Sequence, residues 1–222
     1  MVNVLLEGYD ITVPWLYDEL KNYIKPEHMV AVIAFSFRDE QAKSIEDWDT
    51  LYSKESGKFY GGIAKGFSAY GIAEENISFV NYFSDNKASA AGKIEKADII
   101  YFPGGLPDRM MERIKEFDLY DNLLRHDGIV MGNSAGAVIQ LAEYHLSPDR
   151  DYPEFRYYDG LPYLNDFYLE VHYENTDVQN AAIRRVLAER GKTVYATAFM
   201  AGSIIVDNGA VKLLGDVKTF DK

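Results

Sequence analysis

The sequence predicts an α/β fold with a mostly parallel sheet and a small antiparallel extension at the C-terminus. Two observations carry this prediction. Apolar runs of strand length alternate with amphipathic stretches of helix length over most of the chain, which is the pattern of repeated strand-helix-strand units. After residue 191 the pattern changes to short apolar runs that follow one another closely. With 222 residues, of which 47% are hydrophobic, the chain suits one domain over residues 1–222 with a substantial core.

Six predicted strands account for the apolar runs of the parallel part. Polar, glycine or proline residues bound each run, as expected for buried strands. The predicted strands cover residues 2–6, 29–35, 77–83, 98–102, 129–131 and 167–172.

Helices are predicted in the intervals between these strands. They cover residues 13–23, 61–70, 87–94, 108–116, 120–126, 134–144 and 177–189. Thr176 or Asp177 is the predicted N-cap of the last helix, and Gly191 closes it. Short strands follow at 193–198, 203–206 and 211–214, and Asn208-Gly209 predicts a type I′ turn between the last two. We therefore expect a C-terminal antiparallel hairpin.

The sequence at residues 132–136 has the form of a nucleophile elbow. Gly132, Ala135 and Gly136 are small, as required where a strand turns sharply into a helix. The turn would lift the Ser134 hydroxyl clear of the sheet and point the first amides of the helix at a ligand. The alternative is that small residues merely let the helix pack closely, with Asn133 and Ser134 as an N-cap.

A second motif lies at the end of the strand predicted over 98–102. Pro103-Gly104-Gly105 follows it directly, and two glycines let the backbone turn its amides toward a ligand. The amides of Gly104 and Gly105 are therefore candidates for an oxyanion hole. An ordinary strand-to-helix turn is the alternative. The pairing of the two motifs favours function, because neighbouring strands of a parallel sheet end at one edge.

The composition excludes several classes of function. The chain has no cysteine, which excludes disulfides, thiolate metal sites and a cysteine nucleophile. A net charge of −12 argues against binding nucleic acid or anionic membrane surfaces. Clustered histidines, a Walker motif and a dinucleotide fingerprint are all lacking, so no metal or cofactor is expected. The strand-like start and the lack of a membrane-spanning apolar run predict a cytoplasmic protein.

A serine nucleophile needs a base, and the chain has four histidines. His145 lies eleven residues beyond Ser134 on the same predicted helix, about 16 Å along its axis. His28 and His126 each precede a strand and so lie at the opposite edge of the sheet. His172 alone ends a strand, at the edge where Ser134 is expected. We therefore favour His172 as the base.

The motifs taken in order resemble those of the peptidase E family of serine peptidases, which includes aspartyl dipeptidase and cyanophycinase. The resemblance rests on residues 102–105, 132–137, 160–161 and 170–172, followed by Arg184. It extends over nearly the whole chain. It implies a three-layer α/β/α sandwich of the class I glutamine amidotransferase-like, flavodoxin-like kind.

The resemblance also implies roles for individual residues. Ser134 would be the nucleophile and His172 the base, and the amides of Gly105 and Ala135 would form the oxyanion hole. Arg184 would bind a substrate carboxylate, and Asn133 is a further candidate for binding substrate. The characterised substrates of the family carry an aspartyl residue on the acyl side of the bond that is cut.

The third member of the triad departs from the family pattern. Ala201 occupies the position where the family commonly has an acid, just before Gly202-Ser203. An acid fixes the tautomer of the histidine, and its loss can cost about four decades in rate. Glu170 and Asp149 are the leading replacements. Glu174 and Asp177 are further candidates.

The sequence thus predicts a serine hydrolase that cleaves small peptides, possibly those with an N-terminal aspartyl residue. An esterase or amidase with the same Ser134 and His172 machinery is one alternative. The other is a catalytically silent binding or regulatory protein, because of the missing acid at Ala201. The only expected partner is a small peptide substrate, and the protein is expected to be a monomer or a homodimer.

Overall fold

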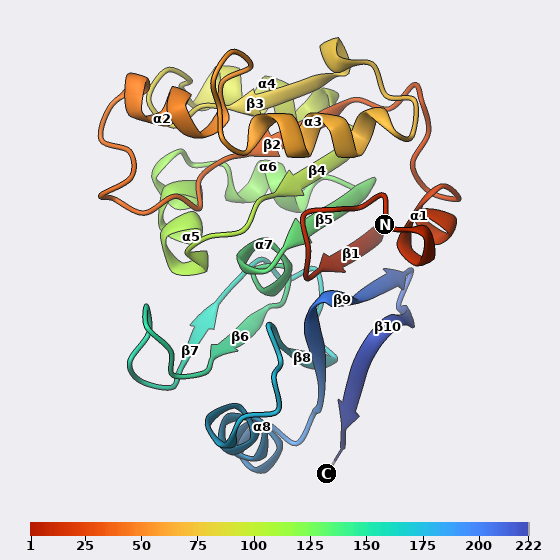
Figure 1. Ribbon diagram of the computed structural model, residues 1–222. Coiled ribbons are helices and arrows are strands. Elements are labelled where there is room, and N and C mark those ends of the chain that lie inside the picture. The colour runs from red at the N-terminus through yellow and green to blue at the C-terminus, as the bar shows by residue number, and fades with distance from the viewer. Residues whose placement is uncertain (222) are drawn as a thin grey trace.

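The computed structural model describes residues 1–221 and contains one large mixed sheet of eight strands (Figure 1). The strand order is β10-β9-β1-β5-β4-β2-β3, and β8 also pairs with β9. The strands are β1 (Val2–Leu6), β2 (Val30–Ile33), β3 (Ile77–Val80), β4 (Ile99–Phe102), β5 (Ile129–Asn133), β8 (Phe167–Glu170), β9 (Thr193–Asp207) and β10 (Ala210–Phe220). A separate hairpin is formed by β6 (Glu143–Leu146) and β7 (Arg156–Asp159).

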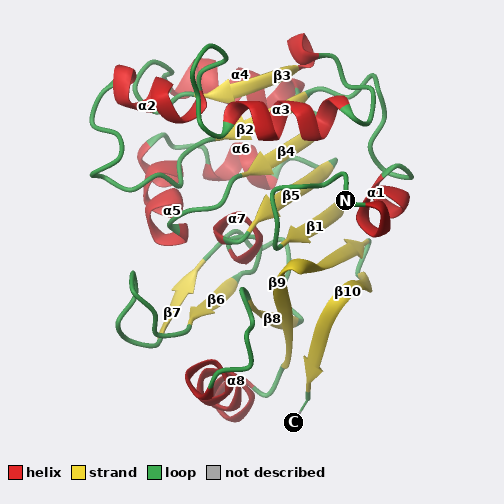
Figure 2. Ribbon diagram, viewed as in Figure 1, coloured by secondary structure: helices red, strands yellow, loops and turns green. Residues whose placement is uncertain are grey.

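The neighbouring strands β1, β5, β4, β2 and β3 all run parallel to one another, whereas β9 runs antiparallel to both β1 and β10. Eight α-helices surround the strands among residues 1–221 (Figure 2). They are α1 (Pro14–Leu20), α2 (Ile45–Tyr52), α3 (Tyr60–Ser68), α4 (Lys87–Lys96), α5 (Pro107–Glu116), α6 (Tyr120–Leu124), α7 (Ala135–Val138) and α8 (Asp177–Arg190). Over the same residues, no helix is long and apolar enough to cross a bilayer.

Two hydrophobic cores lie on opposite faces of the parallel strands, which gives the predicted three layers. Along β4, Ile99 and Tyr101 join the core beneath α1, α2 and α3, while Ile100 and Phe102 join the core beneath α4 to α7. This alternation follows from the two-residue period of a strand. The helix α8 packs on β8 and β9 through a third, smaller core.

The predicted fold class is confirmed, including the C-terminal hairpin. All six predicted parallel strands are present, with ends that differ by a few residues. Asn208 and Gly209 both have positive φ, as the predicted turn between β9 and β10 requires. Thr176 caps α8 in a capping box, and Gly191 ends it in the left-handed conformation.

The helix predicted over 134–144 is wrong beyond its first turn. The helix α7 ends at Val138, and β6 begins at Glu143. The chain leaves the helix because its next backbone groups pair with a distant segment: Leu161 N–H donates to Ile139 O, and Ala142 N–H donates to Leu164 O. Local spacing cannot reveal such pairing.

Three further elements differ from the predictions. No helix or strand was predicted where α2 and β7 lie. The strands predicted over 193–198 and 203–206 are one continuous strand, β9. The strand β9 pairs with β10 on both sides of a register shift near Gly215, which is a β-bulge. This bulge interrupts the apolar pattern of the sequence, although the strand itself is not broken.

Glycines allow the strand β5 to turn sharply into α7. A Cβ on Gly132 would lie 1.9 Å from the carbonyl oxygen of Gly136, and one on Gly136 would lie 2.0 Å from the carbonyl oxygen of Phe102. Both contacts are to backbone, which cannot move aside without shifting the sheet or the helix. The small residues in this motif are therefore a packing requirement of the turn.

We expect Gly136→Ala to destabilise the protein by about 2–4 kcal/mol, because the added methyl group overlaps the backbone of β4. Gly92→Ala is the matched control: Gly92 lies within α4 with open space around it, so alanine should be neutral or stabilise by up to about 1 kcal/mol. Urea unfolding of both variants measures the difference. Equal stabilities would contradict the packing argument.

Candidate active site

Ser134 lies at the tip of the turn between β5 and α7 with a strained backbone. Its φ and ψ are 50° and −105°, a region that residues with side chains rarely adopt. The Ser134 N–H donates to the carbonyl oxygen of Leu6, the last residue of the neighbouring strand β1. The backbone of Ser134 is therefore held by the parallel sheet, and its side chain is left free to project above the carboxyl edge.

The hydroxyl of Ser134 contacts the imidazole of His172. Ser134 Oγ lies 2.6 Å from His172 Nε2, so these two residues, paired by the sequence analysis, are in hydrogen-bonding contact. His172 follows β8 with a φ of 52°, and Gln179 donates to its carbonyl oxygen at 2.9 Å. The start of α8 thus fixes the position of the loop that presents the imidazole.

The acid beside His172 is Glu7, which the sequence analysis missed. Glu7 Oε2 lies 3.1 Å from His172 Nδ1 and accepts the His172 N–H at 3.0 Å. Glu7 is 1% exposed and directly follows β1. The sequence feature that could have identified Glu7 is its position directly after the apolar strand β1. Because β1 is parallel to β5, the two strands end at the same edge of the sheet, where Ser134 lies.

Burial controls the ionisation of Glu7. It raises the pKa of Glu7 to about 8, although hydrogen bonds from the His172 N–H and the Thr197 side chain act in the opposite direction. Within residues 1–221, its other oxygen, Oε1, is buried and has no hydrogen-bond partner. Glu7 is therefore protonated at neutral pH and ionises only in mildly alkaline solution.

The pKa of His172 is lowered, mainly because the imidazole is partly removed from water. The charges of Asp149, Glu170 and Glu174 raise it and offset part of that effect. Glu7 is neutral below about pH 8 and adds no charge to this balance. His172 is therefore an uncharged imidazole at neutral pH, the form that can accept a proton.

The two residues predicted to form an oxyanion hole line the cavity beside Ser134. Gly105 and Ala135 both line it, and among residues 1–221 neither N–H donates to an acceptor. Gly105 has a φ of 145°, and a Cβ there would lie 2.2 Å from the carbonyl oxygen of Ser36. The Ser36 hydroxyl donates to Gly104 O at 2.7 Å, so Ser36 holds the glycine turn in place.

Glu170 does not contact His172. Its Oε2 lies 2.7 Å from His145 Nε2 and accepts the Ser147 hydroxyl at 2.7 Å. The expectation that His145 lies far along a helix from Ser134 is also corrected, because His145 is a buried residue of β6. Its imidazole is directed at Glu170, so it remains separate from Ser134.

The other predicted site residues fall into two groups. Asp149 and Asn133 line the cavity at Ser134, but Asp149 uses Oδ1 to accept the N–H groups of Asp151 and Tyr152 and makes no bond to His172. Arg184 is exposed on α8 and does not line this cavity. The structure therefore does not bring Arg184 to the serine.

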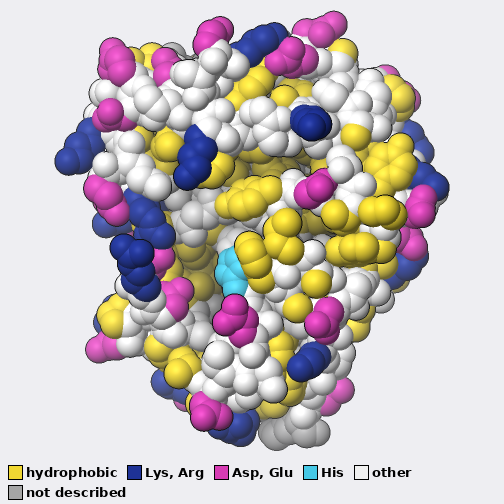
Figure 3. All heavy atoms as spheres, in the orientation of Figure 1, with side chains coloured by type: hydrophobic (Ala, Val, Ile, Leu, Met, Phe, Trp, Pro, Cys, Tyr) yellow, Lys and Arg dark blue, Asp and Glu magenta, His cyan; other side chains and the backbone are white. Residues whose placement is uncertain are grey.

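The cavity at Ser134 has a volume of about 350 Å³ and aromatic walls. Phe199 lies against the His172 ring, with 5.1 Å between centroids, and Tyr9 and Tyr152 also line the cavity. Arg38 lines it as well, with both terminal nitrogens 2.6 Å from the carboxylate oxygens of Asp151. Figure 3 shows a histidine in a hollow beside hydrophobic side chains on this face.

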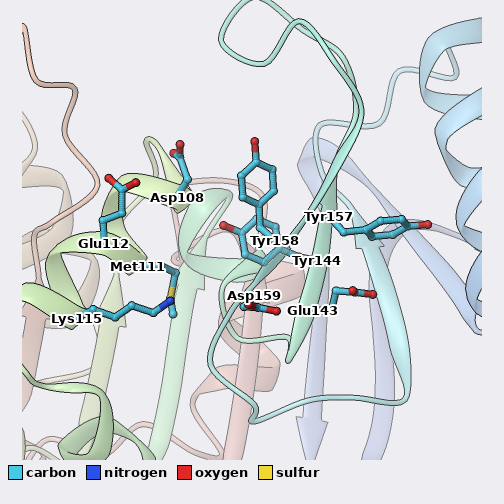
Figure 4. Close-up of a pocket in the computed structure, with 9 residues that line it drawn as sticks. All are labelled: Asp108, Met111, Glu112, Lys115, Glu143, Tyr144, Tyr157, Tyr158 and Asp159. Atoms are coloured by element: carbon cyan, nitrogen blue, oxygen red, sulfur yellow. The ribbon is translucent and has the colours of Figure 1, made fainter.

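A second cavity, of about 360 Å³, lies between α5 and the β6-β7 hairpin. Figure 4 shows side chains of α5, among them Asp108, facing tyrosines of the hairpin. It contains neither Ser134 nor His172, but the Tyr152 hydroxyl donates to Asp108 at 2.6 Å and so connects the two cavities. No three metal-binding side chains converge anywhere in residues 1–221.

Comparisons with known proteins agree with the fold and with the family resemblance. The sequence model of peptidase family S51 matches residues 52–214 of the 222. A structure from Listeria monocytogenes EGD-e, assigned as a peptidase E protein, superposes with a TM-score of 0.64 at 18% identity, over 100% of this chain and 98% of that one. A peptidase from an acI-B1 actinobacterium gives 0.65 at 13% identity, over 99% and 93%. No curated protein matches the chain in sequence.

Replacing Glu7 by glutamine should change how stability depends on pH. The pKa of Glu7 is about 8 in the folded protein and 4.5 when unperturbed, so folding favours the protonated carboxyl. The contribution of this group to the free energy of unfolding is therefore fully present below about pH 4.5 and is lost as the pH rises through 8. We expect the stability of Glu7→Gln relative to the parent to increase between pH 5 and 8, by about 4 kcal/mol in total, and then to level off. Urea unfolding across this range measures it. A difference that stays constant with pH would contradict the raised pKa.

Proposed function

Because this chain belongs to peptidase family S51, we propose that it is a serine peptidase that hydrolyses small peptides through an acyl-enzyme on Ser134. The observation that carries the proposal is the contact of Ser134 Oγ with His172 Nε2 at 2.6 Å. The N–H groups of Gly105 and Ala135, which have no acceptor among residues 1–221, support it, since they would stabilise the charge that develops on an attacked carbonyl.

The reaction begins with attack of Ser134 Oγ on the scissile carbonyl carbon, while its proton passes to His172 Nε2. The carbonyl oxygen becomes an oxyanion and accepts hydrogen bonds from the N–H groups of Gly105 and Ala135. The C–N bond then breaks, and the imidazolium gives its proton to the departing amine. Water, deprotonated by His172, attacks the resulting ester, releases the acid and restores the Ser134 hydroxyl.

In this mechanism Glu7 orients the base. When ionised, its carboxylate accepts the Nδ1–H of His172, which leaves the lone pair of Nε2 directed at Ser134. Glu7 also lies next to the strand that carries Ala201, because Leu6 pairs with Ser203. The proposal therefore places the acid directly after β1, one strand over from the family position. It also removes the reason for regarding the chain as catalytically silent.

The finer specificity that we propose is for peptides with an N-terminal aspartyl residue, as the family resemblance implies. Arg38, and not Arg184, would receive the aspartyl carboxylate, since it is the only cationic side chain among the described residues lining the cavity. Asp151 now occupies both of its terminal nitrogens, so a substrate carboxylate would have to displace Asp151. Aspartyl dipeptides compared with short-chain esters separate a dipeptidase from an esterase.

A fluorophosphonate probe should label Ser134 covalently, because the probe reacts with serines activated by a neighbouring base. We expect labelling of the parent protein and its complete loss in Ser134→Ala, measured by intact mass. Ser68→Ala is the control: Ser68 is the more exposed serine, on α3, and its removal should leave labelling unchanged. A parent protein that resists the probe would refute the nucleophile.

The pH dependence of kcat/KM tests the role of Glu7. Because the productive tautomer of His172 is favoured by ionised Glu7, we expect kcat/KM to rise with pH and to level off above about 8. Glu7→Gln should lose this rise and lower kcat by about 10²–10⁴. Asp149→Asn, a change in the alternative acid, should keep the rise. If Glu7→Gln keeps it and Asp149→Asn loses it, Asp149 is the orienting acid.

A further inference from the structure

Ser36 makes contacts on both sides of Gly105, whose N–H would bind the oxyanion in the proposed mechanism. The Ser36 hydroxyl donates to the carbonyl oxygen of Gly104 at 2.7 Å, and the Ser36 carbonyl oxygen accepts the N–H of Leu106 at 2.8 Å. Ser36 is 0% exposed, whereas Gly105 is exposed and lines the cavity at Ser134. The turn between β4 and α5 (Figure 1) is therefore tied to a buried residue at two points that flank Gly105.

The first of these contacts fixes the orientation of the Gly105 N–H. The carbonyl oxygen of Gly104 and the N–H of Gly105 belong to one planar, trans peptide unit, so the two groups point in opposite directions. Because the oxygen is bound by Ser36, the N–H points away from Ser36. Rotating this peptide would require breaking the bond from the Ser36 hydroxyl.

A buried arginine in turn holds the backbone around Ser36. Arg113 of α5 is 6% exposed, and its Nη1 donates to the carbonyl oxygens of Phe35 and Phe37 at 2.6 and 2.7 Å. These two carbonyls flank Ser36, and no backbone N–H among residues 1–221 donates to either of them. The guanidinium also lies over the Phe37 ring, 3.7 Å from its centroid, and Nη2 donates to Asp39 at 2.6 Å.

The segment that carries Ser36 lies beyond the sheet and needs such support. The strand β2 ends at Ile33, so pairing with β3 and β4 does not extend to residues 35–37. Burying a guanidinium costs free energy that an apolar side chain of similar volume would not cost. What Arg113 provides beyond such a side chain is a pair of charge-assisted bonds that fix the backbone on both sides of Ser36.

We propose that Ser36 and Arg113 are positioning residues for the oxyanion hole. Arg113 fixes the backbone around Ser36, and Ser36 aims the N–H of Gly105 into the cavity at Ser134. Neither Ser36 nor Arg113 lines that cavity, so both act through the glycine turn. The inference rests on the proposed function, because an oxyanion forms only if Ser134 attacks a carbonyl.

Two covalent reactions at the site distinguish this role from a general structural one. When Ser134 displaces fluoride from a fluorophosphonate, negative charge develops on the phosphoryl oxygen, which needs hydrogen-bond donors as a carbonyl oxyanion does. When His172 is alkylated by iodoacetamide, the charge leaves with the iodide instead, and the chain has no cysteine to compete. Mass spectrometry measures both rates at about pH 9, where Glu7, with its pKa of about 8, is mostly ionised.

We expect Ser36→Ala to slow the reaction of Ser134 at least about tenfold, since losing an oxyanion donor costs about 10²–10³ and here the donor is misaligned, not removed. Alkylation of His172 should keep the parent rate. Ser78→Ala is the matched control, because the Ser78 hydroxyl also donates to a backbone carbonyl, that of Val30 at the start of β2, at 3.0 Å. It should leave both rates unchanged. A parent rate at Ser134 in Ser36→Ala, or equal slowing of both reactions, would overturn the proposal.

Arg113→Lys tests the support of Ser36 and remains informative if Ser36→Ala does not fold. Lysine keeps the charge but lacks the planar fork, so we expect the reaction of Ser134 to slow by at least about threefold. In the Ser36→Ala background the same change should have a smaller effect, because residues that act as one unit are not additive. Arg109→Lys, on the same helix, is the control and should react at the parent rate. A parent rate in Arg113→Lys, or fully additive losses, would overturn the role of Arg113.

Failure of the proposed function has a different signature. A parent protein whose Ser134 resists the fluorophosphonate lacks the nucleophile, and the inference fails with it. If the parent reacts and Ser36→Ala reacts equally fast, the nucleophile stands and only the positioning role fails.

Discussion

The parallel pairing of β1 with β5 is the constraint on which the site depends. Leu6 pairs with Asn133, so the residues that follow, Glu7 and Ser134, leave the sheet side by side. The Ser134 N–H is bonded to Leu6 O, and the carboxylate of Glu7 reaches the same imidazole that Ser134 contacts. A shift in this register would separate the acid from the hydroxyl, whatever the local shape of the elbow.

The sequence was sufficient to predict the architecture because the apolar runs of a parallel sheet are continuous and the turns are marked by glycine, proline and Asn-Gly. It also predicted the contact of Ser134 with His172, since both follow strands that end at one edge. The segment after α7 was not predictable, because its backbone bonds to residues 160–164 outweigh a helical pattern. Only the folded chain reveals those partners.

The missed acid has a different cause. The predicted acids were Glu170, two residues before His172, and Asp149, in the loop fifteen residues after Ser134, whereas Glu7 lies 165 positions from His172. Glu170 is adjacent in sequence but is held by His145 and Ser147. The alternation of side chains along a strand predicts which face of the sheet each side chain occupies. It does not predict which of several carboxylates is held by another side chain and which one contacts the imidazole. The chemistry of the imidazole is set by neighbours across strands.

The position of β9 between β1 and β10 joins the first residues of the chain to some of the last. The strand β1, which Glu7 directly follows, can complete its pairing only after residues 203–207 exist. A growing polypeptide still on the ribosome therefore carries the serine and the histidine without the finished sheet that aligns them. The alignment of Glu7 with Ser134 thus depends on a strand that is synthesised after both residues.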